Sequence, residues 1–123
     1  MRLGSKLVMA MAGVLALTGA VEAAVMTTPV LLVGTNIFMS CMISNVSDKR
    51  TKVRIEVIGF YGDVLDDSGE ITLEPGVSDG RSATEHARCR FTVDNKNAVR
   101  AMATVNQPGI GSTSVVEARC TAP

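Results

Sequence analysis

Short runs in which apolar and polar residues alternate make up most of the sequence after residue 24. The clearest run is 52–57 (KVRIEV), where every second residue is apolar. Comparable alternation occurs at 37–44, 71–74, 88–93, 99–105 and 115–120. A period of two places the apolar side chains on one face of a strand. Because no segment beyond residue 24 keeps a helical period over three turns, the sequence predicts an all-β fold.

Segments rich in turn-forming residues separate these runs. They are 45–50 (NVSDKR), 59–63 (GFYGD), 66–69 (DDSG), 94–97 (DNKN) and 107–112 (QPGIGS). A short apolar run at 29–33 is a further candidate strand, 94–97 is expected to be a hairpin turn, and 77–85 lacks periodicity and is expected to be a loop. Seven to eight short strands in about 100 residues predict an antiparallel two-sheet sandwich that forms one domain, residues 24–123.

The first 23 residues have the layout of a secretory signal peptide. Arg2 and Lys6 precede an uncharged apolar run at 7–21, and small residues follow at 23 and 24. The run is too short for a transmembrane anchor, which needs roughly 20 apolar residues. We expect cleavage after Ala23, with cleavage after Ala20 as the alternative. The mature protein is then exported to the periplasm or the extracellular space, and N-terminal sequencing should find Ala24 first.

Charge and composition narrow the function classes. Lys plus Arg and Asp plus Glu number twelve each, and removal of Arg2, Lys6 and Glu22 leaves ten basic and eleven acidic residues, a net charge of −1. Domains that bind nucleic acid are clearly basic, so no nucleic-acid partner is expected. The 46% of hydrophobic residues is too high for a disordered chain. The mature chain is expected to be a monomer without a transmembrane segment.

Several blocks of the sequence resemble the immunoglobulin-like and fibronectin-type sandwiches of exported bacterial proteins. The blocks are 41–47 (CMISNVS), 53–60 (VRIEVIGF), 71–76 (ITLEPG), 89–93 (CRFTV) and 99–105 (VRAMATV). Their order is also similar to that of a group of small exported bacterial proteins of uncharacterised type. The resemblance implies an immunoglobulin-like sandwich. The chain departs from antibody domains because it has no Trp and no tyrosine corner.

The three cysteines, Cys41, Cys89 and Cys120, all fall on the apolar faces of their runs. In an exported protein, two such thiols are expected to form a disulfide, and the odd count leaves one over. The resemblance implies that Cys41 pairs with Cys89; the residues alone leave Cys89–Cys120 and Cys41–Cys120 open. The remaining thiol is expected to be buried and inert, because only His86 is available as an imidazole base.

A group of basic residues alternates outward on three of the predicted strands. The group comprises Lys52, Arg54, Arg88, Arg90 and Arg100. If the strands at 52–58, 88–93 and 98–105 lie side by side, these residues form a basic stripe on one sheet. Such a stripe is a candidate contact for an anionic surface, such as lipid headgroups or acidic polysaccharide. The presence of Glu56 favours the alternative, a solvated face that discourages aggregation.

The remaining polar motifs favour structural interpretations. An acidic cluster contains Asp63, Asp66, Asp67 and Glu70. It suits tight turns better than a twelve-residue calcium loop. One histidine and three core cysteines make a poor metal set. Gly109 and Gly111 are not followed by the helix that a phosphate-binding loop requires, and the sequon at Asn45 is expected to be a turn.

These observations predict a protein without catalytic residues or cofactors. There is no nucleophile–base–acid set, no metal set and no glycine-rich loop in a suitable context. We expect a secreted or periplasmic module with a structural or interaction role toward a protein or an envelope component. The alternatives are a subunit of a surface assembly, completed by strand exchange, and a binder of anionic surfaces through the basic stripe.

Overall fold

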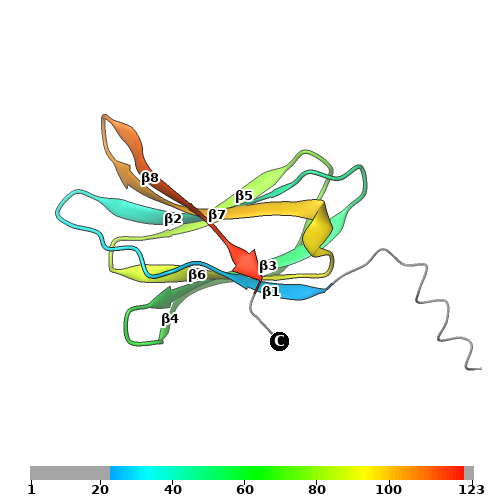
Figure 1. Ribbon diagram of the computed structural model, residues 1–123, viewed down its shortest axis with the longest axis horizontal. Coiled ribbons are helices and arrows are strands. Elements are labelled where there is room, and N and C mark those ends of the chain that lie inside the picture. The colour runs from blue at the N-terminus through cyan, green and yellow to red at the C-terminus, as the bar shows by residue number, and fades with distance from the viewer. Residues whose placement is uncertain (1–22, 121–123) are drawn as a thin grey trace, which may run out of the picture.

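The structure is a computed structural model that describes residues 23–120. In this part of the chain, two antiparallel sheets pack face to face as two layers (Figure 1). The predicted signal peptide, apart from Ala23, lies outside the described residues, as do residues 121–123. No helix within residues 23–120 is long and apolar enough to cross a membrane. The predicted all-β, two-sheet architecture is confirmed.

The sheets contain five and four strands. The five-stranded sheet has the order β4 (Val64–Leu73), β3 (Thr51–Gly59), β6 (Ala87–Val93), β1 (Ala24–Thr27) and β9 (Arg119–Cys120). The four-stranded sheet has the order β5 (Ser78–Ala83), β2 (Phe38–Asn45), β7 (Val99–Gln107) and β8 (Gly111–Glu117). A single turn of 3₁₀ helix, η2 (Lys96–Ala98), joins β6 to β7. Residues 23–120 therefore contain nine strands, against the seven to eight expected.

The alternation in the sequence produces the core between the sheets. Val53, Ile55 and Val57 of β3 are at most 1% exposed, while the intervening Lys52 and Arg54 face solvent. Strands β2 and β6, which carry the disulfide, contribute buried residues in the same way. These are Met39, Cys41 and Ile43 of β2 and Cys89, Phe91 and Val93 of β6. Burial of these apolar side chains is the main stabilising term.

The structure of three segments before residue 84 differs from the prediction. Residues 78–83 form β5 rather than a loop, because backbone pairing with β2 needs no apolar side chains. Residues 64–73 form one strand, and irregular pairing with β3 accommodates the expected turn at 66–69. The segment 29–33 is not a strand; it pairs with β6 only through a bridge between Leu31 and Ala87.

The order of the strands differs from the expected one at β7. The sequence predicts that 52–58, 88–93 and 98–105 lie side by side in one sheet, as the corresponding strands do in immunoglobulin domains. The structure pairs β3 with β6, but β7 crosses to the other sheet and pairs with β2. The segment 94–97 is therefore a connection between sheets and not a hairpin turn. Local alternation cannot distinguish these arrangements, because either one buries the same face of β7.

A disulfide joins the two sheets through the middle of the core. Cys41 of β2 and Cys89 of β6 are bonded, with 5.6 Å between their Cα atoms, and both are fully buried. This pairing is the one that the resemblance implied. The bond closes a loop of 48 residues, which contributes roughly 4 kcal/mol on the chain-entropy view.

The third cysteine contradicts its prediction, because Cys120 is a free and exposed thiol. The prediction that Cys120 is buried requires one continuous strand from 115 to 120. The chain instead leaves β8 at Glu117, crosses between the sheets at buried Ala118, and pairs with β1 as β9. Because the chain changes sheets at Ala118, the alternation in β8 does not determine which side chains of β9 are buried, and Cys120 is exposed.

A buried asparagine fixes one end of the sandwich. The side-chain amide of Asn45, 1% exposed, donates to the carbonyls of Lys49 and Leu73 at 2.7 and 2.9 Å. Its Oδ1 accepts from the backbone N–H and the hydroxyl of Ser47. All of its hydrogen-bonding capacity is thus used to hold the turn at 45–49 against β4. The sequon is a structural turn, as expected.

We predict that the disulfide makes a large contribution to the net stability of the domain. Replacing both Cys41 and Cys89 by Ala should lower the free energy of unfolding by about 2–5 kcal/mol. Replacing Cys120 by Ser should change it by less than about 0.5 kcal/mol, because this side chain is exposed. Urea unfolding without reductant measures both values. Mass mapping of the oxidised protein that found Cys120 in the bridge would contradict the assignment.

Candidate functional site

The end of the sandwich opposite Asn45 is built from connecting segments that are tied to the sheets. The segment between β1 and β2 is held to β6 by Thr28, whose backbone N–H donates to the carbonyl of Cys89, and by Leu31, which exchanges two backbone hydrogen bonds with Ala87. The turn between β3 and β4 is closed by a bond from the N–H of Gly59 to the carbonyl of Asp63. A rigid scaffold therefore positions these loops, the usual arrangement of binding loops.

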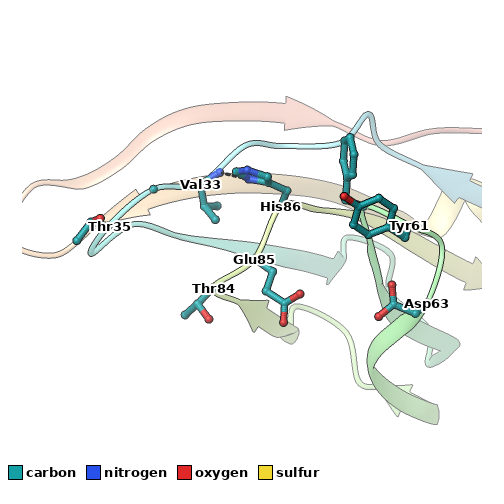
Figure 2. A pocket seen from close by; sticks show the side chains of 9 residues that line it. Val33, Thr35, Tyr61, Asp63, Thr84, Glu85 and His86 are labelled. Atoms are coloured by element: carbon teal, nitrogen blue, oxygen red, sulfur yellow. Dashed lines mark hydrogen bonds between the residues drawn. The ribbon is translucent and has the colours of Figure 1, made fainter.

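A groove of about 600 Å³ lies among these loops (Figure 2). It is lined by residues 33–35, Phe60, Tyr61, Asp63 and residues 84–86. The three contributing segments connect β1 to β2, β3 to β4, and β5 to β6. This groove brings together residues that lie up to about fifty positions apart in the sequence, so we treat it as the candidate functional site.

Two aromatic side chains stand exposed at the groove. Phe60 is 56% and Tyr61 is 92% exposed, and their ring centroids lie 5.1 Å apart in an edge-to-face arrangement. The whole chain has only three Phe and one Tyr. Exposed aromatic surface of this kind contributes nothing to the core and is typical of recognition sites. The sequence predicts only a turn at 59–63; the two adjacent aromatic residues within that turn are the signal that points to a site.

His86 is fixed in orientation beside the aromatic pair. The backbone N–H of Val33 donates to its Nδ1 at 2.9 Å, and its ring lies 6.3 Å from that of Phe60. Nδ1 therefore acts as the acceptor in this geometry, which leaves Nε2 as the ring nitrogen that can donate. Within residues 23–120, no group of three or more His, Cys, Asp or Glu side chains is placed to hold a metal ion.

Two carboxylates, Asp63 and Glu85, face each other across the groove (Figure 2). Neither side chain accepts a hydrogen bond from, or forms an ion pair with, another residue of the described chain. The Oδ1 of Asp63 lies close to the backbone of Gly59, since a Cβ added at Gly59 would be only 2.7 Å from it. The nine lining residues include no Lys or Arg, so the groove carries negative charge.

The predicted basic stripe does not exist as one surface. Arg100 lies on β7, in the other sheet. Arg54 makes a two-pronged ion pair with Asp67, and Arg90 makes another with Glu56, both N–O distances of the latter being 2.9 Å. Cross-strand pairing thus neutralises two of the five cations. Lys52 and Arg88 remain without an ion-pair partner in the described residues.

These ion pairs shift the titration of their carboxylates. Hydrogen bonds from Arg90 lower the pKa of Glu56, against the opposing effect of burial. Hydrogen bonds from Arg54, and then from the backbone N–H of Gly69, lower the pKa of Asp67 to about 2. Asp67 therefore forms an ion pair within the sheet, whereas Asp63 lines the groove. The acidic residues that are close in sequence thus have different structural roles.

The loop containing Gly109 and Gly111 also has a structural role. Residues 108–110 form the turn of the β7–β8 hairpin, closed by a bond from the N–H of Ile110 to the carbonyl of Gln107. Both glycines have positive φ angles, 85° and 98°, which other residues adopt at a cost. The expected hairpin loop is confirmed.

Comparison with known proteins supports the fold alone. No protein-family model and no curated protein sequence matches the chain. A solved structure described as the crystal structure of Thermotoga maritima 1070 is similar, with a TM-score of 0.51 and 12% sequence identity. The similarity covers 83% of this chain and 96% of the other. At this level of identity it shows a shared two-sheet architecture, with no activity attached.

The ion pairs predict how stability depends on pH. Because the folded-state pKa values of Glu56 and Asp67 lie below the ordinary values of these carboxyl groups, their contribution is fully present above about pH 5. It should be lost as the pH falls toward 2. Urea unfolding between pH 6 and 2 measures the loss, which should be smaller in Asp67→Asn. The matched control is Glu74→Gln, which removes an exposed pair with Arg50. An unchanged pH profile in Asp67→Asn would contradict this account.

Proposed function

We propose that the protein is an exported, non-catalytic β-sandwich module that binds a partner through the loop-end groove. The partner is a protein or another component of the cell envelope. The observation that carries this proposal is the exposure of Phe60 and Tyr61 beside a groove on a rigid scaffold. Folding alone would not select two adjacent exposed aromatics in a chain with four.

Export is supported by the disulfide. A buried Cys41–Cys89 bond is stable in an oxidising compartment, such as the periplasm or the extracellular space, and unusual in the cytosol. The same inference agrees with the signal peptide expected at residues 1–23. We propose that the relationship to immunoglobulin-like domains extends to the two-layer architecture only, because β7 lies in the other sheet from the one expected for such a domain.

The groove chemistry favours binding over catalysis. Its lining contains the hydroxyls of Thr35, Thr84 and Tyr61 but no Ser or Cys, and the Nδ1 of His86 is occupied by the N–H of Val33. A general base that activates a nucleophile needs a hydrogen bond to that nucleophile, and no such bond links His86 to a hydroxyl in the described residues. The groove therefore offers a recognition surface rather than a reactive pair.

A second candidate is a subunit of a larger surface assembly. Strand β8 supports it, because it forms the outer edge of its sheet, is exposed along most of its length, and has neither Lys nor Pro to discourage pairing. A third candidate, binding of anionic surfaces, is weakened because Arg54 and Arg90 are paired. Sizing chromatography distinguishes the second candidate: a monomer at micromolar concentration argues against it.

The proposed function predicts where ligands bind. In an NMR screen of small soluble probes against the exported protein, ligands should perturb residues 33–35, 60–63 and 84–86. Tyr61→Ala should weaken binding at least about fivefold, because an aromatic contact contributes roughly 1 kcal/mol. Ile110→Ala is the matched control, since Ile110 is also exposed but lies outside the groove.

Three outcomes would contradict the proposal. Ligands that cluster at Lys52 and Arg88 instead would support the anionic-surface candidate. Turnover in a screen of hydrolase substrates would refute the non-catalytic assignment. A complete absence of perturbation in the groove would remove the proposed site.

A further inference from the structure

We infer that the loop-end groove recognises an organic cation, an alkylammonium or guanidinium group. This inference rests on the proposed function and names the ligand class of the same site. The juxtaposition that carries it is two unpartnered carboxylates, Asp63 and Glu85, beside the exposed rings of Phe60 and Tyr61.

The two carboxylates are free to bind a ligand. Elsewhere in the described chain, Glu56, Asp67 and Glu74 are neutralised by arginines. Asp63 and Glu85 have no such partner, and no cationic side chain lines the groove. Their charges therefore add, and the negative potential between them favours a positive ligand.

The aromatic rings add a second attraction of the same sign. The face of an aromatic ring carries negative electrostatic potential, and a cation within about 6 Å of the ring centre is attracted to it. Tyr61, at 92% exposure, keeps its ring available for such contact. The Nδ1 of His86 is already engaged by the N–H of Val33, and neither Lys nor Arg lines the groove.

Other ligand classes fit less well. An anion would meet two carboxylates and no cation, which is repulsive. A neutral apolar ligand would remove water from Asp63 and Glu85 without replacing their hydrogen bonds. A cation alone compensates for the loss of water at both carboxylates and contacts the rings. Uncharged sugars, which also stack on aromatic rings, are distinguished by the experiment below.

The test compares ligands that differ only in charge. Choline and its neutral isostere 3,3-dimethylbutan-1-ol are titrated into the labelled full-length exported protein at low salt, and NMR shifts are followed at 60–63 and 84–86. Choline should bind about tenfold more tightly, because cation–π and Coulomb contributions together reach roughly 1–2 kcal/mol. A second arm compares N-acetyl-lysine methylamide with its 2-aminoheptanoic acid analogue, in which a methyl group replaces the ammonium, and asks whether a protein side chain is recognised as well as a small headgroup.

Charge variants of the protein complete the test. Asp63→Asn combined with Glu85→Gln should abolish the preference for choline, while Glu70→Gln, an exposed residue on β4 outside the groove, should leave it intact. Raising the salt concentration should reduce the preference through screening. Thermal unfolding of each variant confirms that it remains folded.

The outcomes separate this inference from the function on which it rests. Equal affinity for choline and its isostere, or tighter binding of uncharged sugars in the groove, would overturn the cation preference and keep the groove as a binding site. If neither choline nor the lysine derivative binds while other probes perturb the groove, the inference is likewise wrong. If no probe of any class perturbs the groove, the proposed function fails together with it.

Discussion

The bond between Cys41 and Cys89 is the constraint on which the rest of the structure depends. It joins the two sheets at their centres. Antibody-type domains pack a Trp against this bond, and this chain has no Trp. A domain of about 100 residues buries only enough surface for a modest margin of stability. With the disulfide restricting the unfolded chain, a core of aliphatic residues around the single buried ring of Phe91 is sufficient.

The two ends of the sandwich use that stability differently. At one end, Asn45 satisfies four hydrogen bonds and closes the turns against the sheets. At the other end, the loops are anchored by their backbones, while Phe60, Tyr61, Asp63 and Glu85 present side chains to solvent. Outside the groove, Glu56 and Asp67 on the face of the five-stranded sheet are each engaged by an arginine. Polar side chains thus stabilise the fold at the Asn45 end, and at the groove end they remain available to a ligand.

How much of this the sequence predicts depends on the range of the interaction. Strands such as β3 were predictable because each inward side chain is buried against the opposite sheet. Strand β5 was not, because backbone pairing with β2 carries polar residues such as Ser82 into the sheet. The position of β7 and the exposure of Cys120 depend on where the chain changes sheets, which local alternation does not encode. The groove requires three loops to meet, so the sequence singled out Asp63 and His86 separately and did not indicate that they line one site.

The central claim is that Phe60 and Tyr61 serve recognition and not folding. The most direct test is the free energy of unfolding of the double variant Phe60→Ser/Tyr61→Ser, measured in urea beside the wild type and beside Phe91→Ala in the core. The account predicts an unchanged or slightly higher value for the groove variant, since residues kept for function are not optimised for stability. Phe91→Ala should lose about 3–5 kcal/mol. A loss of more than about 1 kcal/mol in the groove variant would show that the aromatic pair supports the fold, and would contradict the account.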